Sequence, residues 1–92
     1  MNGPAGYTEV TGDALVKSGP GRIAAVVLTP AAAVASLILY DNTSAAGNIV
    51  ATLQAAANGN SVVLSLPGAI SFTKGLYADI GGSGATAYVY LV

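Results

Sequence analysis

Residues 23–40 read IAAVVLTPAAAVASLILY and contain no charged side chain. These 18 uncharged residues approach the length of a transmembrane helix. However, Pro30 interrupts the stretch near its middle, and its most apolar residues gather in the flanking segments, 23–28 and 34–40. Each flanking segment has the length of a strand and is rich in β-branched or aromatic residues. The stretch therefore favours two strands joined by a proline-containing turn, and no membrane partner is expected.

Turn-forming residues recur at short intervals along the rest of the chain. Clusters of Gly, Pro, Asn and Asp occur at 19–21, 41–42, 58–60, 67–68 and 81–84, and such residues supply the backbone angles that a reversing chain needs. The expected strands are 14–18, 22–29, 34–40, 48–54, 61–66, 69–73, 76–80 and 85–92. Short strands at this spacing are typical of sandwiches and barrels. We therefore expect an all-β fold, an eight-stranded antiparallel β-sandwich or a jelly-roll-like barrel.

The hydrophobic pattern also predicts which strand faces are covered. Leu76, Ala78 and Ile80 alternate with more polar residues, which indicates one buried and one solvated face. Segments 22–29 and 86–92 are apolar on both faces. We expect both segments to be covered twice, by their own core and by another subunit or a loop.

The chain is expected to form one domain, residues 13–92, preceded by an extended N-terminal arm, residues 1–12. Gly and Pro surround Tyr7 and Val10 in this arm, so no core element is expected there. A frayed terminus is the alternative interpretation. The first 15 residues contain neither the basic segment nor the apolar run of a secretory signal.

Composition excludes several kinds of chemistry. Only 8% of the 92 residues are charged, against about 25% in a typical soluble domain. Without Cys or His, the chain cannot form the usual zinc sites, Cys nucleophiles or His-based triads. Three cations and a net charge of −1 argue against a nucleic-acid partner. Because so small a domain usually needs disulfides, a metal or other subunits, partner subunits are the expected means of stabilisation.

No motif in the chain predicts an active site. The Gly-rich segment 81–84 lacks the Lys and the following helix of a phosphate-binding loop, so a hairpin turn is the preferred interpretation. Asp41 and Asp79 are expected at strand ends, where surface charge is common. Segment 41–44 lacks the Gly and the terminal Glu of a calcium-binding loop. We therefore expect no catalytic, cofactor-binding or metal-binding residue, and a protein that is not an enzyme.

Four of the five tyrosines fall on expected strands: Tyr40, Tyr77, Tyr88 and Tyr90. Tyr is common where one end of a side chain is buried and the other is in water, so these residues could simply cover core edges. Tyr is also enriched in subunit interfaces, from which charged residues are depleted. Exposed aromatics clustered beside a carboxylate would instead favour a carbohydrate-binding module.

Four short motifs resemble one family of proteins. They are KSGPGR at 17–22, LYDNTSAAG at 39–47, LPG at 66–68 and GLYA at 75–78. With these motifs, the stretch from Val16 to Tyr90 resembles small β-proteins in the structural modules of tailed bacteriophages. The resemblance implies a virion component, and several such proteins are capsid decoration or cement proteins.

The implied role is to bind across joints between major capsid subunits and to stabilise the head. The protein would then be made in the host cytoplasm and lie on the outer surface of the capsid, bound to the major capsid protein and to copies of itself, with a homotrimer favoured. A tail, fibre or baseplate subunit, or a carbohydrate- or receptor-binding module, remains an alternative. The candidate interface residues are Tyr7, Val10, Arg22, Ala24, Val26, Leu28, Tyr88 and Tyr90.

Overall fold

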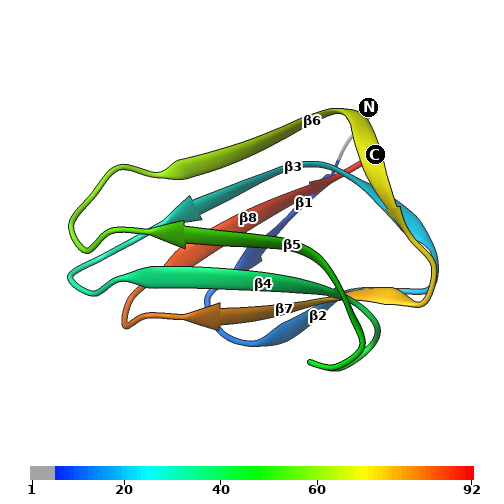
Figure 1. The fold of residues 1–92 in the computed structure, drawn as a ribbon, viewed down its shortest axis with the longest axis horizontal. Coiled ribbons are helices and arrows are strands. Elements are labelled where there is room, and N and C mark those ends of the chain that lie inside the picture. The colour runs from blue at the N-terminus through cyan, green and yellow to red at the C-terminus, as the bar shows by residue number, and fades with distance from the viewer. Residues whose placement is uncertain (1–5) are drawn as a thin grey trace.

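The computed structural model describes residues 6–92, apart from the side chains of 66–68, and this range forms eight strands (Figure 1). They are β1 (Gly6–Val10), β2 (Ala14–Ser18), β3 (Gly21–Thr29), β4 (Ala35–Asp41), β5 (Asn48–Ala55), β6 (Val62–Phe72), β7 (Gly75–Gly81) and β8 (Thr86–Leu91). No helix in the described range is long and apolar enough to cross a membrane.

The strands form two antiparallel sheets that pack as a sandwich, not as a closed barrel. The first sheet has the order β1-β8-β3-β6, and the second has the order β2-β7-β4-β5. The first strand therefore pairs with the last and the following strands pair inward in the same way: β1 with β8, β2 with β7, β3 with β6 and β4 with β5. This nested order is that of a jelly-roll sandwich. The expected all-β sandwich is confirmed.

Most connections cross from one sheet to the other, and only β4 and β5 are consecutive strands paired with each other. The segment 81–84 is one of the crossings, because β7 and β8 belong to different sheets. The hairpin expected there is wrong. Gly82 has a φ of +105°, and a Cβ at this position would collide with the carbonyl oxygen of Val34. Glycine at this position thus permits the segment that leaves β7 to lie close against the backbone that enters β4.

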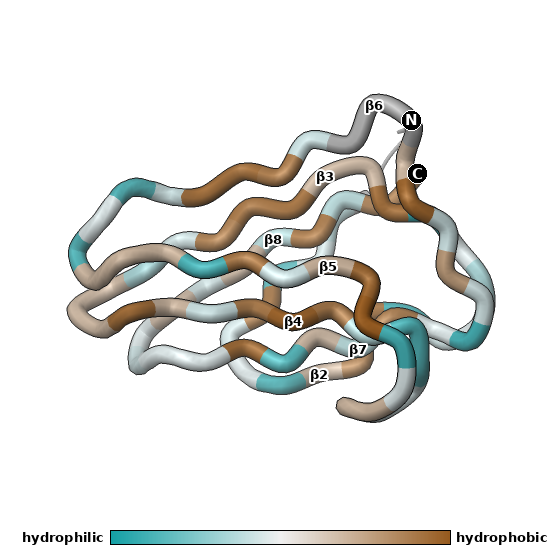
Figure 2. The backbone as a smooth tube through the Cα atoms, viewed as in Figure 1, coloured by the Kyte–Doolittle hydropathy of each residue, from teal (hydrophilic) through white to brown (hydrophobic). Residues whose placement is uncertain are grey.

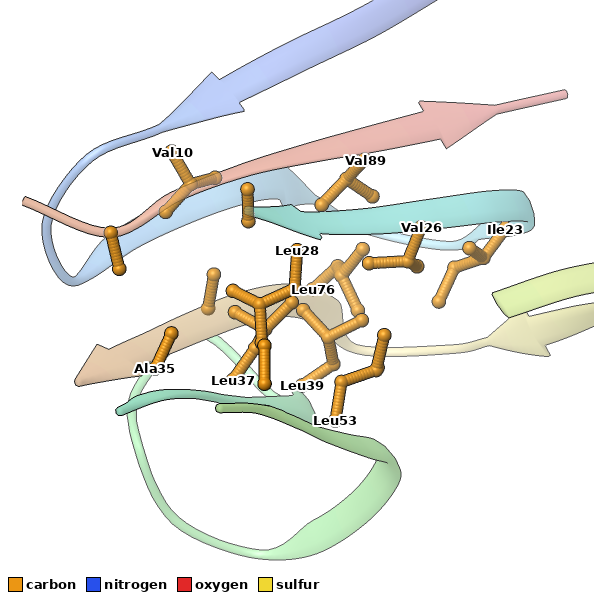
Figure 3. Packing of buried hydrophobic residues seen from close by; sticks show 14 of the residues in the cluster. Val10, Ile23, Val26, Leu28, Ala35, Leu37, Leu39, Leu53, Leu76 and Val89 are labelled. Atoms are coloured by element: carbon orange, nitrogen blue, oxygen red, sulfur yellow. The ribbon is translucent and has the colours of Figure 1, made fainter. Parts of the chain in front are cut away.

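Apolar side chains from both sheets fill the space between them (Figure 3). Ile23, Leu28 and Val89 come from the first sheet, and Leu37 and Leu39 from the second; each is 0% exposed. The most hydrophilic segments lie largely in the loops, whereas β3 and β4 are hydrophobic along most of their length (Figure 2). The radius of gyration, 12.4 Å, matches the roughly 12 Å expected for a compact domain of this length.

The orientation of β3 differs from the expected one. Val26 and Leu28, two of the candidate interface residues, are 0% exposed and lie in the core, not on an outer face. The pairing of β3 shifts register between Ile23 and Ala25, which changes the alternation so that Ile23 and Val26 both point inward. In a continuously apolar run, the sequence shows no sign of such a shift.

Two other segments also differ from expectation. Residues 6–10 of the expected arm are strand β1, which pairs with β8 and places Val10 in the core at 1% exposure; residues 1–5 lie outside the described range. The expected strands 61–66 and 69–73 are parts of the single strand β6. Its pairing with β3 shifts register between Ser65 and Ile70, and Ala69 takes a φ of +56°. The irregularity therefore lies within one strand, where a turn was expected at the Pro-Gly pair.

Candidate functional site: a tyrosine face on the first sheet

The outward side of the first sheet presents two rows of side chains across its four strands. In register, Tyr7, Tyr90, Ala25 and Ser65 form one row, and Glu9, Tyr88, Val27 and Val63 form the next. We call these eight residues the tyrosine face. Glu9 is the only charged residue among them. They point outward because they alternate with the buried residues Val10, Val26, Leu28, Ala87 and Val89.

Three tyrosine rings are in contact on this face. The centroid of the Tyr7 ring lies 6.2 Å from that of Tyr88 and 5.8 Å from that of Tyr90, with interplanar angles of 58° and 39°. Tilted pairs at such separations are favourable aromatic contacts. The cluster forms because β1 pairs with β8 so that Tyr7 faces Tyr90 and Glu9 faces Tyr88. Tyr7 remains 65% exposed.

Glu9 interacts with one of the three tyrosines, Tyr88. The Tyr88 hydroxyl donates a hydrogen bond to Glu9 Oε2 at 3.3 Å. The negative charge of Glu9, together with this hydrogen bond, raises the pKa of Tyr88 above its usual value. Tyr88 therefore keeps its proton and acts as a donor throughout the physiological range. The face thus combines exposed aromatic surface with one carboxylate acceptor, which suits it to binding a partner.

The other predicted interface residues are divided between the core and the surface. Val10, Val26 and Leu28 are buried, so in this fold their side chains cannot reach a partner. Ala24 is half-buried, and Arg22 is exposed near the start of β3. Of the predicted set, Tyr7, Tyr88 and Tyr90 are brought together on the outward side of the sheet.

Sequence reasoning missed the β3 and β6 part of the face. Val27 stands next to Tyr88 in register, and Val63, which is 62% exposed, stands next to Val27. Ala25 lies beside Tyr90 in the same way. Because segment 22–29 is apolar on both faces, the sequence indicates that its outer face is covered as well. Which residues form that face depends on the register shift in β3.

Asp41 and Asp79, both expected at strand ends, have separate structural partners. Asp41 Oδ1 accepts hydrogen bonds from the backbone N–H groups of Thr73 (3.0 Å) and Lys74 (2.9 Å), which hold the pKa of Asp41 below its usual value, with the Lys74 bond the larger cause. Burial raises the pKa of Asp79, and the neighbouring charge of Asp13 adds to the effect. Asp13 Oδ1 in turn accepts a hydrogen bond from the backbone N–H of Ile80 at 2.9 Å. These hydrogen bonds connect the β6–β7 connection to β4 and the β1–β2 connection to β7.

Within residues 6–92, no three acidic side chains come close enough together to hold a metal ion, and the surface of that range has no cleft. The chain matches no protein-family model, and neither the curated proteins nor the solved structures contain a significant match to it.

Proposed function

We propose that this chain is a non-enzymatic virion structural protein, a capsid decoration or cement protein that binds across joints between major capsid subunits. The observation that carries the proposal is the tyrosine face, which spans all four strands of one sheet with a single charged residue. Protein interfaces are enriched in Tyr and depleted of charged residues at their centre. A face of this composition suits a protein partner.

Two further observations support a place in a virion. The turn and strand-end motifs resemble those of tailed-phage structural proteins. The nested strand order is that of jelly-roll sandwiches, which occur in many viral capsid domains, although a fold by itself assigns no function. A decoration protein performs no reaction. Its binding free energy favours the assembled head over the separated subunits, so many copies together oppose expansion by the packaged genome.

The experiment is mass spectrometry of separately purified heads and tails, using virions that carry wild-type protein or a variant. We expect the wild type in heads and a Tyr90→Ser variant depleted from them. Tyr77→Ser is the matched control, because Tyr77 lies on the second sheet, and it should remain on heads. Recovery only in tails would instead support a tail, fibre or baseplate subunit. Absence from both fractions would contradict any virion role.

A carbohydrate- or receptor-binding module is the second candidate, and one specific observation favours it. Tyr7, Tyr88 and Tyr90 form an exposed aromatic cluster beside the carboxylate of Glu9. Sugar rings stack their apolar faces on aromatic side chains, and carboxylates accept hydrogen bonds from sugar hydroxyls. An NMR titration with neutral oligosaccharides tests this candidate: shifts confined to β1 and β8 and lost in Tyr88→Ala would support it, and unchanged spectra would reject it.

A further inference from the structure

Three of the four sheet edges are interrupted. On β2, Val16 is an extra residue between Leu15 and Lys17 in the pairing with β7. On β5, Val50 is extra in the pairing with β4. On β6, the pairing with β3 shifts register between Ser65 and Ile70, the partners of Ala25 and Ile23. An unpaired strand edge is a template for another strand, and bulges, Pro and Lys are common means of blocking it.

The fourth edge, β1, is regular. Its five residues pair one-to-one with β8 from Gly6↔Leu91 to Val10↔Ala87, without a shift. Among the described residues, β1 pairs with no strand other than β8. Its outward side chains, Tyr7 and Glu9, make their contacts with rings of β8, and Val10 points into the core. The side chains of β1 are thus engaged with their own sandwich, on the side away from the free backbone edge.

We propose that β1 pairs antiparallel with β1 of a second copy of this chain, about a two-fold axis at Thr8. Outward side chains must meet outward side chains across the new ladder, which leaves few registers. The register centred on Thr8 places Tyr7 opposite the second copy's Glu9, and Glu9 opposite the second copy's Tyr7. The register centred on Glu9 would place two like charges directly opposite, which is unfavourable. Charge and hydroxyl complementarity therefore favour the Thr8 register over the Glu9 register.

This pairing joins the first sheets of the two copies into one continuous sheet and joins their tyrosine faces. Antiparallel pairing of identical strands has two-fold symmetry, so it gives a dimer, whereas a trimer is the expectation from the sequence. Five residues of ladder form a small interface, below the roughly 1,000 Å² of most stable assemblies. We therefore expect a weak, concentration-dependent dimer. The dimer belongs to the isolated chain and stands whether or not the capsid proposal does.

Substitutions at Tyr7 test the register. Tyr7→Lys places an ammonium opposite the second copy's Glu9, and Tyr7→Glu places a carboxylate there; both remove the same ring from an exposed position. By sedimentation equilibrium at low ionic strength, we expect the Kd of Tyr7→Lys to be at least about tenfold lower than that of Tyr7→Glu. The difference should shrink at about 1 M salt. Equal Kd values for the two variants would overturn the proposal, as would a wild type that stays monomeric at about 1 mM.

Cysteine crosslinking tests the axis, because the natural chain has no Cys. Residues directly opposite in an antiparallel pair have Cα atoms about 4.5–5.5 Å apart, within disulfide range. Under mild oxidation, Thr8→Cys should form a covalent dimer. Thr52→Cys on the interrupted edge strand β5 is the matched control and should stay monomeric. Crosslinking of Thr52→Cys alone, or of neither variant, would overturn the pairing through β1.

Discussion

Asp41 shows how a single side chain can hold two strands in place. It ends β4, and its carboxylate binds the turn between β6 and β7 through Thr73 and Lys74. We predict that Asp41→Asn lowers the melting temperature at pH 7 by a few degrees, because an amide is a weaker acceptor for the two backbone N–H groups. Circular dichroism during heating measures the change. An unaltered melting temperature would show that the turn holds without the charge.

The pH dependence of this effect follows from the lowered pKa of Asp41. A carboxyl with a depressed folded-state pKa stabilises the fold above its ordinary value of 3.8, and the contribution disappears as the pH falls through the folded value. The difference in melting temperature between wild type and Asp41→Asn should therefore be constant near neutral pH and disappear in strong acid. Asp79→Asn is the control of opposite sign: the pKa of Asp79 is raised, so its charge opposes folding at neutral pH and the variant should be at least as stable as wild type.

Among the elements, β1 is the clearest test of whether the N-terminal segment belongs to the domain. Val10→Ala removes two methyl groups from a side chain that is 1% exposed, and we predict a loss of about 2 kcal/mol in the free energy of unfolding. Val63→Ala makes the same change on β6, where the side chain is 62% exposed, and should have almost no effect. Urea denaturation compares the two. Equal, small effects would mean that β1 behaves as a detachable arm.

β1 is also the strand that could not be predicted from the sequence. Strands such as β4 and β5 agree with the expected ranges to within a residue, because turn residues and apolar runs mark their ends locally. β1 is a strand because β8 pairs with it, and four residues of alternation after a glycine are too short a signal. For the candidate site, the pattern selects Tyr7, Tyr88 and Tyr90, which the structure places together on the outward side of the first sheet. It misses Val27 and Val63, because a register shift set by packing determines their side of the sheet.

At the scale of the whole molecule, the scarcity of charge means that hydrophobic burial and short-range hydrogen bonds supply the stability. The net charge is −1, and the carboxylates of Glu9, Asp13 and Asp41 act through hydrogen bonds to a hydroxyl or to backbone N–H groups. Salt screens interactions between separated charges, of which this chain has few. We predict that raising sodium chloride from about 0.05 to 1 M shifts the melting temperature by less than about 3 °C at fixed protein concentration. Sodium sulfate should raise it clearly, because excluded salts strengthen apolar burial. A large shift in chloride, equal to that in sulfate, would mean that the charged side chains determine the stability of the fold.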